Sequence, residues 1–159
     1  KLGRLKLKNL IMNDMVWSIK ADNDNFQKIV NRLRAFAVDI TESKGVNLVF
    51  NVNQDAEQLV LKMTQRKNIY LIFKEAINNA IKYSKANKIE IEIKVKDKLL
   101  SLLIKDNGNG FDYIEDENYD NLLGGNGISG MQFRAKQIKA KLQIHSSNAG
   151  TNIELLLKL

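Results

Sequence analysis

The sequence predicts an α+β protein that folds as a two-layer α/β sandwich with a helical stub at its N-terminus. Two patterns predict this class. Long segments carry apolar residues at steps of three and four, as in amphipathic helices, and shorter segments alternate apolar with polar residues, as in half-buried strands. The chain has 159 residues, which suits one compact domain plus one further element, and 44% of them are hydrophobic, which is enough for a core.

The first two predicted helices lie in the N-terminal quarter of the chain. Residues 1–20 have partial helical spacing and apolar residues on more than one side, so this helix needs partners on several faces. Asp24 with Gln27 resembles a capping box, and the apolar spacing that follows predicts a helix to about Lys44. Gly45 is a suitable left-handed cap for its end.

Two later segments also predict helices. The clearest runs from about Lys62 to Tyr83, because its apolar residues recur regularly at helical spacing: Ile69, Ile72, Phe73, Ala76, Ile77, Ala80 and Ile81. A last helix is predicted from Gly127 to about Lys141. Residues 112–120 between them are acidic and polar, and we interpret residues 112–123 as a lid over a site, with a plain surface loop as the alternative.

Alternation predicts the strands. They are expected at residues 46–52, 89–95 and 99–105, at Leu142 and Ile144, and at residues 153–159. Loops or turns are expected at 53–57, at Asp97-Lys98 and at 147–150. Packing these strands against the helices gives the α/β sandwich.

Composition excludes several classes of protein. The chain has no cysteine and a single histidine, so disulfides, the common zinc ligand sets and histidine-based catalytic triads are excluded. That histidine, His145, is predicted to be a surface residue. No run of 18 apolar residues is present, so no membrane span is expected. The net charge of +7 raises nucleic acid as a partner, but the lysines are scattered, and a solvated basic surface is the better interpretation.

One polar cluster lies on the clearest helix. Glu75, Asn79 and Lys82 are spaced at i, i+4 and i+7, so they share one helix face opposite the isoleucines. Asn79 can give a Mg²⁺ ion an amide oxygen, Lys82 can meet phosphate charge, and Glu75 can orient or deprotonate a nucleophile. The alternative is an ordinary solvated face.

A second cluster follows the strand at residues 99–105. Asp106 can accept a hydrogen bond from the exocyclic amine of adenine, which guanine lacks at that position. Gly108 and Gly110 allow a ligand to approach the backbone closely. The alternative is a tight turn between strands, but no alternating strand follows Phe111.

A third cluster opens the last helix. Gly125, Gly127 and Gly130 surround its predicted start, where free N–H groups and the helix dipole attract phosphate. The segment lacks the Gly-Lys-Ser/Thr of a Walker A loop and does not follow a strand, as a dinucleotide fingerprint would. A flexible hinge is the alternative.

These clusters resemble the motifs of the GHKL ATPases, which include gyrase, a heat-shock chaperone and the histidine kinases. The segment from Glu75 to Ser84 looks like their N box, and residues 106–111 look like their first glycine box. Residues 125–131, with Ile128 and Met131, look like the second glycine box of sensor histidine kinases with short lids, and Gly150-Thr151 also matches. The match covers about residues 25–159.

The resemblance implies a function and a set of site residues. Asn79 would bind Mg²⁺, Asp106 would read adenine, and the glycine boxes would flank the phosphates of ATP. Glu75 matches the position of the base in ATP-hydrolysing relatives. Tyr83 departs from the family pattern, because many of these kinases have histidine at that position. The implied nucleotide-contacting set is Asn79, Lys82, Tyr83, Asp106, Gly108, Gly110, Phe111, Gly125, Gly127, Ile128, Gly130, Met131 and Thr151.

The resemblance also implies an organisation and partners. Residues 1–22 would be the end of a dimerisation helix with its linker, and residues 23–159 the catalytic ATP-binding domain. The phosphoacceptor histidine would lie outside this chain, on dimerisation helices of a homodimer, and a response-regulator receiver domain would take the phosphate. The location would be cytoplasmic, as part of a membrane-bound sensor. An anti-sigma-type serine kinase and a catalytically silent nucleotide-binding module remain the alternatives.

Overall fold

The computed structural model describes residues 25–113 and 126–159. Four helices and five strands follow one another in these residues: α2 (Phe26–Lys44), β1 (Asn47–Val52), α3 (Gln54–Glu57), α4 (Met63–Tyr83), β2 (Lys88–Lys96), β3 (Leu99–Asp106), α5 (Asn126–Gln137), β4 (Lys141–Ser147) and β5 (Gly150–Lys158). The predicted first helix and the domain boundary at residue 22 lie outside the described residues, as do most of the predicted lid and Gly125.

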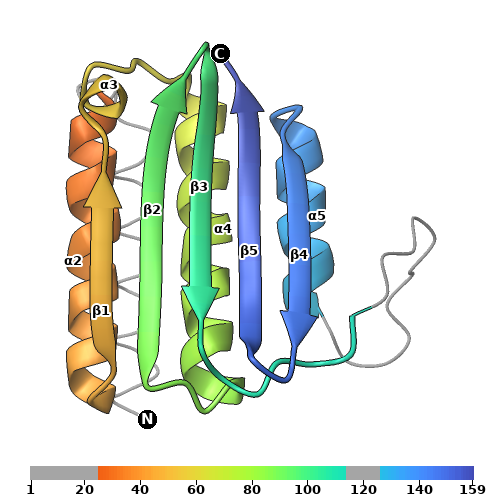
Figure 1. The fold of residues 1–159 in the computed structure, drawn as a ribbon. Coiled ribbons are helices and arrows are strands. Elements are labelled where there is room, and N and C mark those ends of the chain that lie inside the picture. The colour runs from red at the N-terminus through yellow and green to blue at the C-terminus, as the bar shows by residue number, and fades with distance from the viewer. Residues whose placement is uncertain (1–24, 114–125) are drawn as a thin grey trace, which may run out of the picture.

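The strands form one mixed sheet in the order β1-β2-β3-β5-β4. β1 runs parallel to β2, and the other neighbouring strands are antiparallel. Figure 1 shows α2, α4 and α5 side by side on one face of this sheet, so helices form one layer and strands the other. The predicted α/β sandwich is therefore confirmed, and the predicted strands are all present.

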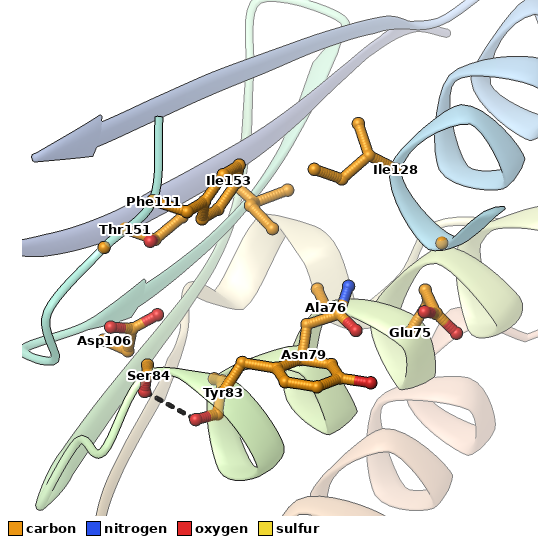
Figure 2. Close-up of a pocket in the computed structure, with 13 residues that line it drawn as sticks. Glu75, Ala76, Asn79, Tyr83, Ser84, Asp106, Phe111, Ile128, Thr151 and Ile153 are labelled. Carbon is orange, nitrogen blue, oxygen red and sulfur yellow. Dashed lines mark hydrogen bonds between the residues drawn. The ribbon is translucent and has the colours of Figure 1, made fainter. Parts of the chain in front are cut away.

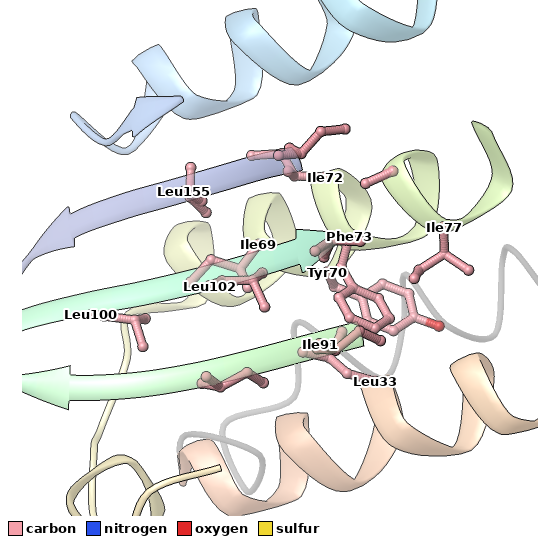
Figure 3. Packing of buried hydrophobic residues seen from close by; sticks show 14 of the residues in the cluster. Leu33, Ile69, Tyr70, Ile72, Phe73, Ile77, Ile91, Leu100, Leu102 and Leu155 are labelled. Atoms are coloured by element: carbon pink, nitrogen blue, oxygen red, sulfur yellow. The ribbon is translucent and has the colours of Figure 1, made fainter. Parts of the chain in front are cut away.

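The central helix α4 joins the two layers. Its apolar stripe is buried as its spacing predicts, and Ile72, Phe73 and Ile77 are at most 1% exposed. Phe73 meets Phe36 of α2 edge to face, at 6.5 Å between ring centroids, and also contacts Phe50 of β1. Figure 3 shows these helix residues facing the inward side chains of the strands. Packing of this kind fixes the position of α4 over the sheet.

Helix α2 begins one residue later than its predicted capping box. Asn25 is the N-cap, and its side-chain oxygen accepts a hydrogen bond from the backbone N–H of Gln27 at 2.8 Å. The amide oxygen of Asn can cap a helix as well as Asp does, so the sequence did not separate the two positions. Gly45 ends the helix in the left-handed region, at φ 66°, as predicted.

Helices α3 and α5 differ from the sequence prediction. The predicted loop at 53–57 contains α3, a single helical turn that is too short to show apolar periodicity. The last helix ends at Gln137 rather than near Lys141. Lys139 adopts a left-handed conformation, and the backbone N–H of Ala140 returns to the carbonyl oxygen of Ala135 at 2.9 Å. That cap ends α5, and Lys141 begins β4.

Several helices and strands begin or end at one edge of the sheet. α4 finishes there, β3 ends, β4 ends, β5 begins and α5 begins, all in the lower part of Figure 1. The segments bearing the three sequence clusters therefore meet at this edge. Among the helices of the described residues, none combines the length and apolar composition that a bilayer crossing requires.

Candidate functional site

A cavity of about 500 Å³ lies at this edge of the sheet. Its volume falls within the range of roughly 300–1,000 Å³ that is usual for small-molecule sites. Its lining comes from α4, the end of β3, the start of α5 and the start of β5: Glu75, Ala76, Asn79, Ala80, Tyr83, Ser84, Asp106, Gly110, Phe111, Gly127, Ile128, Thr151 and Ile153. Figure 2 shows the side chains around this space.

The wall from α4 presents one polar stripe to the cavity. Glu75 and Asn79 both line it, as their spacing predicts, and Tyr83 lies one turn further along. Tyr83 is 74% exposed, so its ring forms part of the cavity's rim. Lys82 is exposed and does not line the cavity. The helix therefore supplies a carboxylate and an amide within the cavity, whereas Lys82 lies outside it.

Asp106 is the carboxylate at the other end of the cavity. Its side chain accepts the backbone N–H of Gly108 at 2.9 Å. Burial raises the pKa of this carboxyl, and hydrogen bonds from the N–H groups of Gly108 and Thr151 act in the opposite direction. Apolar Ala80, Ile153 and Phe111 also line the cavity. A hydrogen-bonding carboxylate among apolar side chains suits a planar base that carries an amino group.

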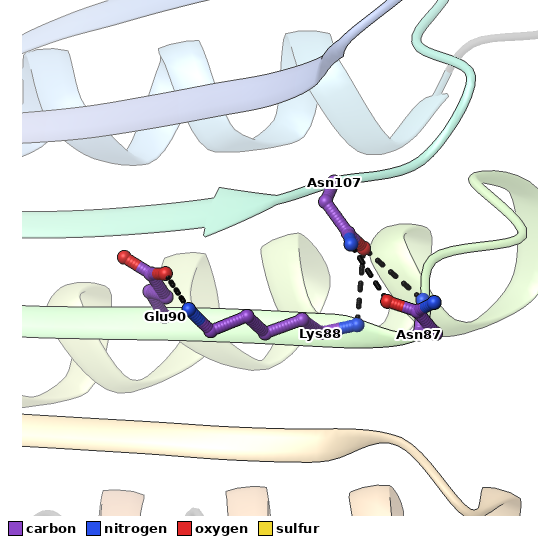
Figure 4. A network of polar contacts seen from close by, with 4 residues as sticks. All are labelled: Asn87, Lys88, Glu90 and Asn107. Atoms are coloured by element: carbon purple, nitrogen blue, oxygen red, sulfur yellow. Dashed lines mark hydrogen bonds and ion pairs between the residues drawn. The ribbon is translucent and has the colours of Figure 1, made fainter.

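Hydrogen bonds hold the loop after Asp106 against the C-cap of α4 and the start of β2. Asn107 Oδ1 accepts from the backbone N–H groups of Asn87 and Lys88, at 3.1 and 3.0 Å, and its Nδ2 donates to Asn87 Oδ1 at 2.7 Å. The N–H of Asn109 donates to the Ser84 carbonyl oxygen at 2.8 Å. Figure 4 shows the Asn87–Asn107 pair beside the ion pair of Lys88 and Glu90. These bonds hold Asp106 in place relative to α4.

Gly108 belongs to this hydrogen-bonded loop, is buried, and does not line the cavity. A Cβ atom added to it would overlap the backbone and side chain of Ser84. Its absence of a side chain therefore lets the loop after β3 approach the end of α4. This close approach explains why position 108 is a glycine without any contact between Gly108 and a ligand.

The start of α5 lies against the polar stripe of α4. A Cβ atom added to Gly127 would overlap the Glu75 carboxylate and would lie 3.3 Å from Asn79 Nδ2. The first turn of α5 therefore stands directly over the carboxylate and the amide. Helix N-termini attract phosphate through free N–H groups, so this end of the cavity suits a phosphate chain.

Some residues of the predicted second glycine box lie outside the cavity lining. Ile128 lines the cavity, but Gly130 and Met131 do not. Met131 is 1% exposed and belongs to the hydrophobic core. Apart from its chain neighbours and the nearby backbone of α5 itself, no described atom lies within 4 Å of the place where a Gly130 side chain would begin. The structure thus brings Gly127 and Ile128 of this box to the cavity.

Sequence reasoning missed several residues around the cavity. Ser84 and Ile153 line it, and Ser146 of β4 accepts the backbone N–H of Phe111 at 2.7 Å. Ser146 also lies 3.1 Å from the hydroxyl of Thr151. A serine on a strand carries no motif, so only the strand register could have placed it here. Thr151, which was predicted, is 6% exposed and lines the cavity.

Fold and cavity together define a class of protein. A helix layer on a mixed sheet opens at one edge into a cavity that has a carboxylate at one end. A carboxylate, an amide and a helix start lie at the other end. This arrangement is typical of a nucleotide-binding domain.

Comparisons with known proteins name the family. Residues 64–159 match the family described as histidine kinase-, DNA gyrase B- and HSP90-like ATPases. The sensor protein VraS of Staphylococcus saprophyticus is 30% identical over 124 residues, which are 77% of this chain and 33% of VraS. The histidine-protein kinase/phosphatase DegS of Brevibacillus brevis is 33% identical over 86 residues, 54% of this chain and 21% of DegS.

Solved structures show the same fold. Histidine kinase AdeS of Acinetobacter baumannii has a TM-score of 0.69 and 17% identity, covering 99% of this chain and 81% of the AdeS chain. The catalytic domain of histidine kinase ThkA also has a TM-score of 0.69, with 13% identity, covering 84% of this chain and 93% of the ThkA chain.

The chain therefore belongs to the family of histidine kinase-, DNA gyrase B- and HSP90-like ATPases. Together with its sensor-kinase relatives, this identifies the chain as the ATP-binding catalytic domain of a histidine kinase. It spans about a third of the length of VraS and about a fifth of the length of DegS.

Proposed function

We propose that this cavity binds Mg·ATP and that the domain passes the γ-phosphate to a histidine of a dimerisation helix outside this chain. The observation that carries the proposal is the cavity itself, because it unites three clusters that are far apart in the sequence. Asp106 would accept from the adenine amino group, and the start of α5 with Gly127 would face the phosphates. A receiver domain of a response regulator would then accept the phosphoryl group.

Glu75 and Asn79 fit a magnesium ion that is held mainly by ATP. Mg²⁺ prefers oxygen ligands and commonly takes only one or two from the protein, the rest coming from phosphates and water. No group of three or more His, Cys, Asp or Glu side chains that could enclose a metal ion is found in the described part of the chain. Asn79 would bind the ion through its amide oxygen, and the ion would neutralise phosphate charge.

The transfer itself needs little covalent help from the protein. An imidazole nitrogen would attack the γ-phosphorus in line with the leaving oxygen, the bond to the bridging oxygen would break, and ADP would leave. Glu75, which lines the cavity, would orient the nucleophile or take its proton. Residues of this chain would act mainly by positioning the nucleotide.

His145 does not fit the role of acceptor. It is exposed on β4, next in sequence to Ser146, and successive side chains of a strand point to opposite faces. Ser146 bonds to residues at the cavity, so His145 points to the other face of the sheet. Because His145 is the single histidine of these 159 residues, the acceptor histidine would lie outside them, as the resemblance to sensor kinases implies.

The relatives favour this function over the two alternatives. VraS and DegS are named as a sensor protein and a histidine-protein kinase/phosphatase, names that favour a histidine kinase over a serine kinase of the anti-sigma type. A silent nucleotide-binding module would share the cavity but not the transfer. We also infer that the domain works in the cytoplasm, where ATP and receiver domains are found.

The deciding experiment separates binding from transfer. Calorimetric titration of the 159-residue chain with a non-hydrolysable ATP analogue and Mg²⁺ should give a one-to-one isotherm. A longer protein that adds the dimerisation helices should become labelled by ATP carrying a radioactive γ-phosphate, on an acid-labile phosphohistidine. Binding without any labelling would support the silent module, and absence of binding by the folded chain would refute the proposal.

A further inference from the structure

Three strands place polar side chains in one row beside the cavity. Asp106 of β3 lies opposite Thr151 of β5, and Thr151 lies opposite Ser146 of β4. Residues directly opposite one another on neighbouring strands share a face of the sheet, so the three side chains form a continuous row. Asp106 and Thr151 line the cavity. Ser146, on the far side of Thr151 in this row, does not line it.

The donors and acceptors of this row favour one direction of hydrogen bonding. The backbone N–H of Phe111 can only donate, and it donates to Ser146 Oγ at 2.7 Å. Ser146 Oγ lies 3.1 Å from Thr151 Oγ1, and either hydroxyl can supply the hydrogen for that contact. Within residues 25–113 and 126–159, Thr151 Oγ1 is an acceptor that lies within hydrogen-bonding distance of the Ser146 hydroxyl. If Thr151 donated instead, the Ser146 hydrogen would have no described acceptor.

When the Ser146 hydroxyl donates to Thr151 Oγ1, the hydrogen of the Thr151 hydroxyl is left to bond to a ligand in the cavity. The chain of donation then runs from Phe111 N–H to Ser146, from Ser146 to Thr151, and from Thr151 toward a ligand. Buried hydroxyl groups are rarely left without a partner, and Thr151 is 6% exposed. The cavity therefore presents an acceptor, Asp106, next to a donor, Thr151.

We propose that Ser146 is a positioning residue for base recognition, because its hydroxyl turns the Thr151 hydroxyl into a donor toward the ligand. This inference rests on the proposed binding of ATP. An acceptor next to a donor complements the edge of adenine, where the 6-amino group donates and N1 accepts. Guanine presents the reverse pair, an accepting O6 and a donating N1–H, and would mismatch both side chains.

The nearby glycine keeps this row in contact with the loop after β3. A Cβ atom added to Gly110 would overlap the Ser147 carbonyl oxygen and would lie 2.8 Å from Ser146 Oγ. The loop that carries Phe111 thus rests on the end of β4. Ser146 is in this way bonded to the loop on one side and to Thr151 on the other.

The test compares ADP with 1-deaza-ADP, in which a C–H group replaces N1, by calorimetric titration of the 159-residue chain with Mg²⁺. For the wild type, 1-deaza-ADP should bind about tenfold more weakly, because the Thr151 hydrogen loses its acceptor. In Ser146→Ala the penalty should fall to about threefold or less, since the Thr151 hydroxyl is then free to turn. Thr151→Val should remove the penalty altogether.

Two variants control for a merely structural role. Ser147→Ala, one residue along β4, removes a hydroxyl that accepts from the backbone N–H of Ala149 at 3.2 Å and takes no part in the row. It should keep the wild-type penalty, and so should Ser146→Thr, which retains a hydroxyl. General loosening of the site would weaken ADP and 1-deaza-ADP alike and leave their ratio unchanged.

Three results would overturn the inference. An undiminished penalty in Ser146→Ala would show that Ser146 does not orient Thr151. Equal affinity of the wild type for ADP and 1-deaza-ADP would show that no donor faces N1, while ATP binding itself would stand. Failure of the folded wild type to bind either nucleotide would refute the proposed function and this inference with it. If Ser146→Ala does not fold, Ser146→Val against Ser146→Thr gives the same comparison.

Discussion

At the scale of single residues, Asp106 shows a conflict between stability and binding. Burial raises the pKa of its carboxyl, so the ionised form is disfavoured in the folded protein without a ligand. The same ionised form is the one that accepts a hydrogen bond from a base. A residue whose charge disfavours the free protein but favours the complex is typical of a binding site.

We expect Asp106→Asn to weaken binding of the ATP analogue by about tenfold to a hundredfold, because it replaces an ionised acceptor with a neutral amide. The melting temperature of the free protein should be unchanged or higher, since a half-buried charge is removed. Calorimetric titration and a thermal melt of the two proteins check these expectations. A lower melting temperature with unchanged affinity would assign Asp106 a structural role only.

The same shift predicts a pH dependence. Because folding raises the pKa of Asp106, the folded state binds this proton more tightly than the unfolded state does. The contribution of Asp106 to stability is therefore fully present below its unfolded pKa of about 3.9 and is lost as the pH rises through the folded value. Urea unfolding over this range should show the wild type gaining stability relative to Asp106→Asn as the pH falls. A parallel pH dependence of the two proteins would contradict the shift.

Asn79 offers a second test at a single position. Asn79→Asp adds a negative charge at the phosphate end of the cavity, so Mg·ATP should bind less tightly and the longer protein should label itself more slowly, each by about tenfold. Asn78→Asp is a matched control, since it adds the same charge one position away on α4, outside the cavity lining. Equal effects of the two substitutions would indicate a general charge effect instead of a contact at Asn79.

At the scale of elements, the surroundings of the glycines in α5 and β5 differ in whether they leave room for a side chain. Gly130 lies inside α5, and no described atom beyond its chain neighbours and the nearby backbone of that helix lies within 4 Å of its missing Cβ. Gly150 begins β5 with φ at 127°, and an added Cβ would overlap the Asp106 carbonyl oxygen. The first glycine is replaceable in structural terms, whereas the second permits a close approach between two backbones.

These glycines give opposite predictions for alanine. Gly130→Ala should stabilise the protein by about 0.5–1 kcal/mol, because alanine loses less backbone entropy in a helix. Gly150→Ala should destabilise it by about 1–3 kcal/mol or more through backbone strain. Denaturant unfolding measures both changes. Destabilisation by Gly130→Ala would reveal a contact outside the described residues, and titration of the same variant tests whether Gly130 contributes to nucleotide binding.

At the scale of the whole molecule, the cavity is built from elements that only the fold brings together. α4, the end of β3, the start of α5 and the start of β5 each supply part of its lining. A bound nucleotide would therefore contact all four elements and hold them together. Ligands that bind only the folded state stabilise it by mass action.

Mg·ATP should accordingly raise the melting temperature of the chain. At a concentration of about 100 times the dissociation constant, the gain is about 2.7 kcal/mol, which corresponds to roughly 5–10 °C for a domain of this size. Mg·GTP at the same concentration should give a much smaller shift, because its base edge mismatches Asp106. Differential scanning calorimetry measures both shifts. Equal shifts for the two nucleotides would mean that the base is not read.

Much of the site was predictable because its motifs are local. Glu75 and Asn79 share a helix face through their spacing, and Asp106 and Gly127 stand at predicted element ends. The positions that could not be predicted depend on packing across elements. Lys82 has the right spacing but lies outside the cavity, and Ser146 has no local signal yet bonds to Thr151 and Phe111.

By itself the sequence determined the strands, the long helices α2, α4 and α5, the α/β class and the three polar clusters, because periodicity and glycine positions act over a few residues. Only the tertiary structure decided the strand order β1-β2-β3-β5-β4, which sets Asp106, Thr151 and Ser146 in one row. It also decided that Gly127 meets Glu75, whereas Met131 is buried in the core. Such contacts join residues far apart in the chain, and their geometry is set by how whole elements pack.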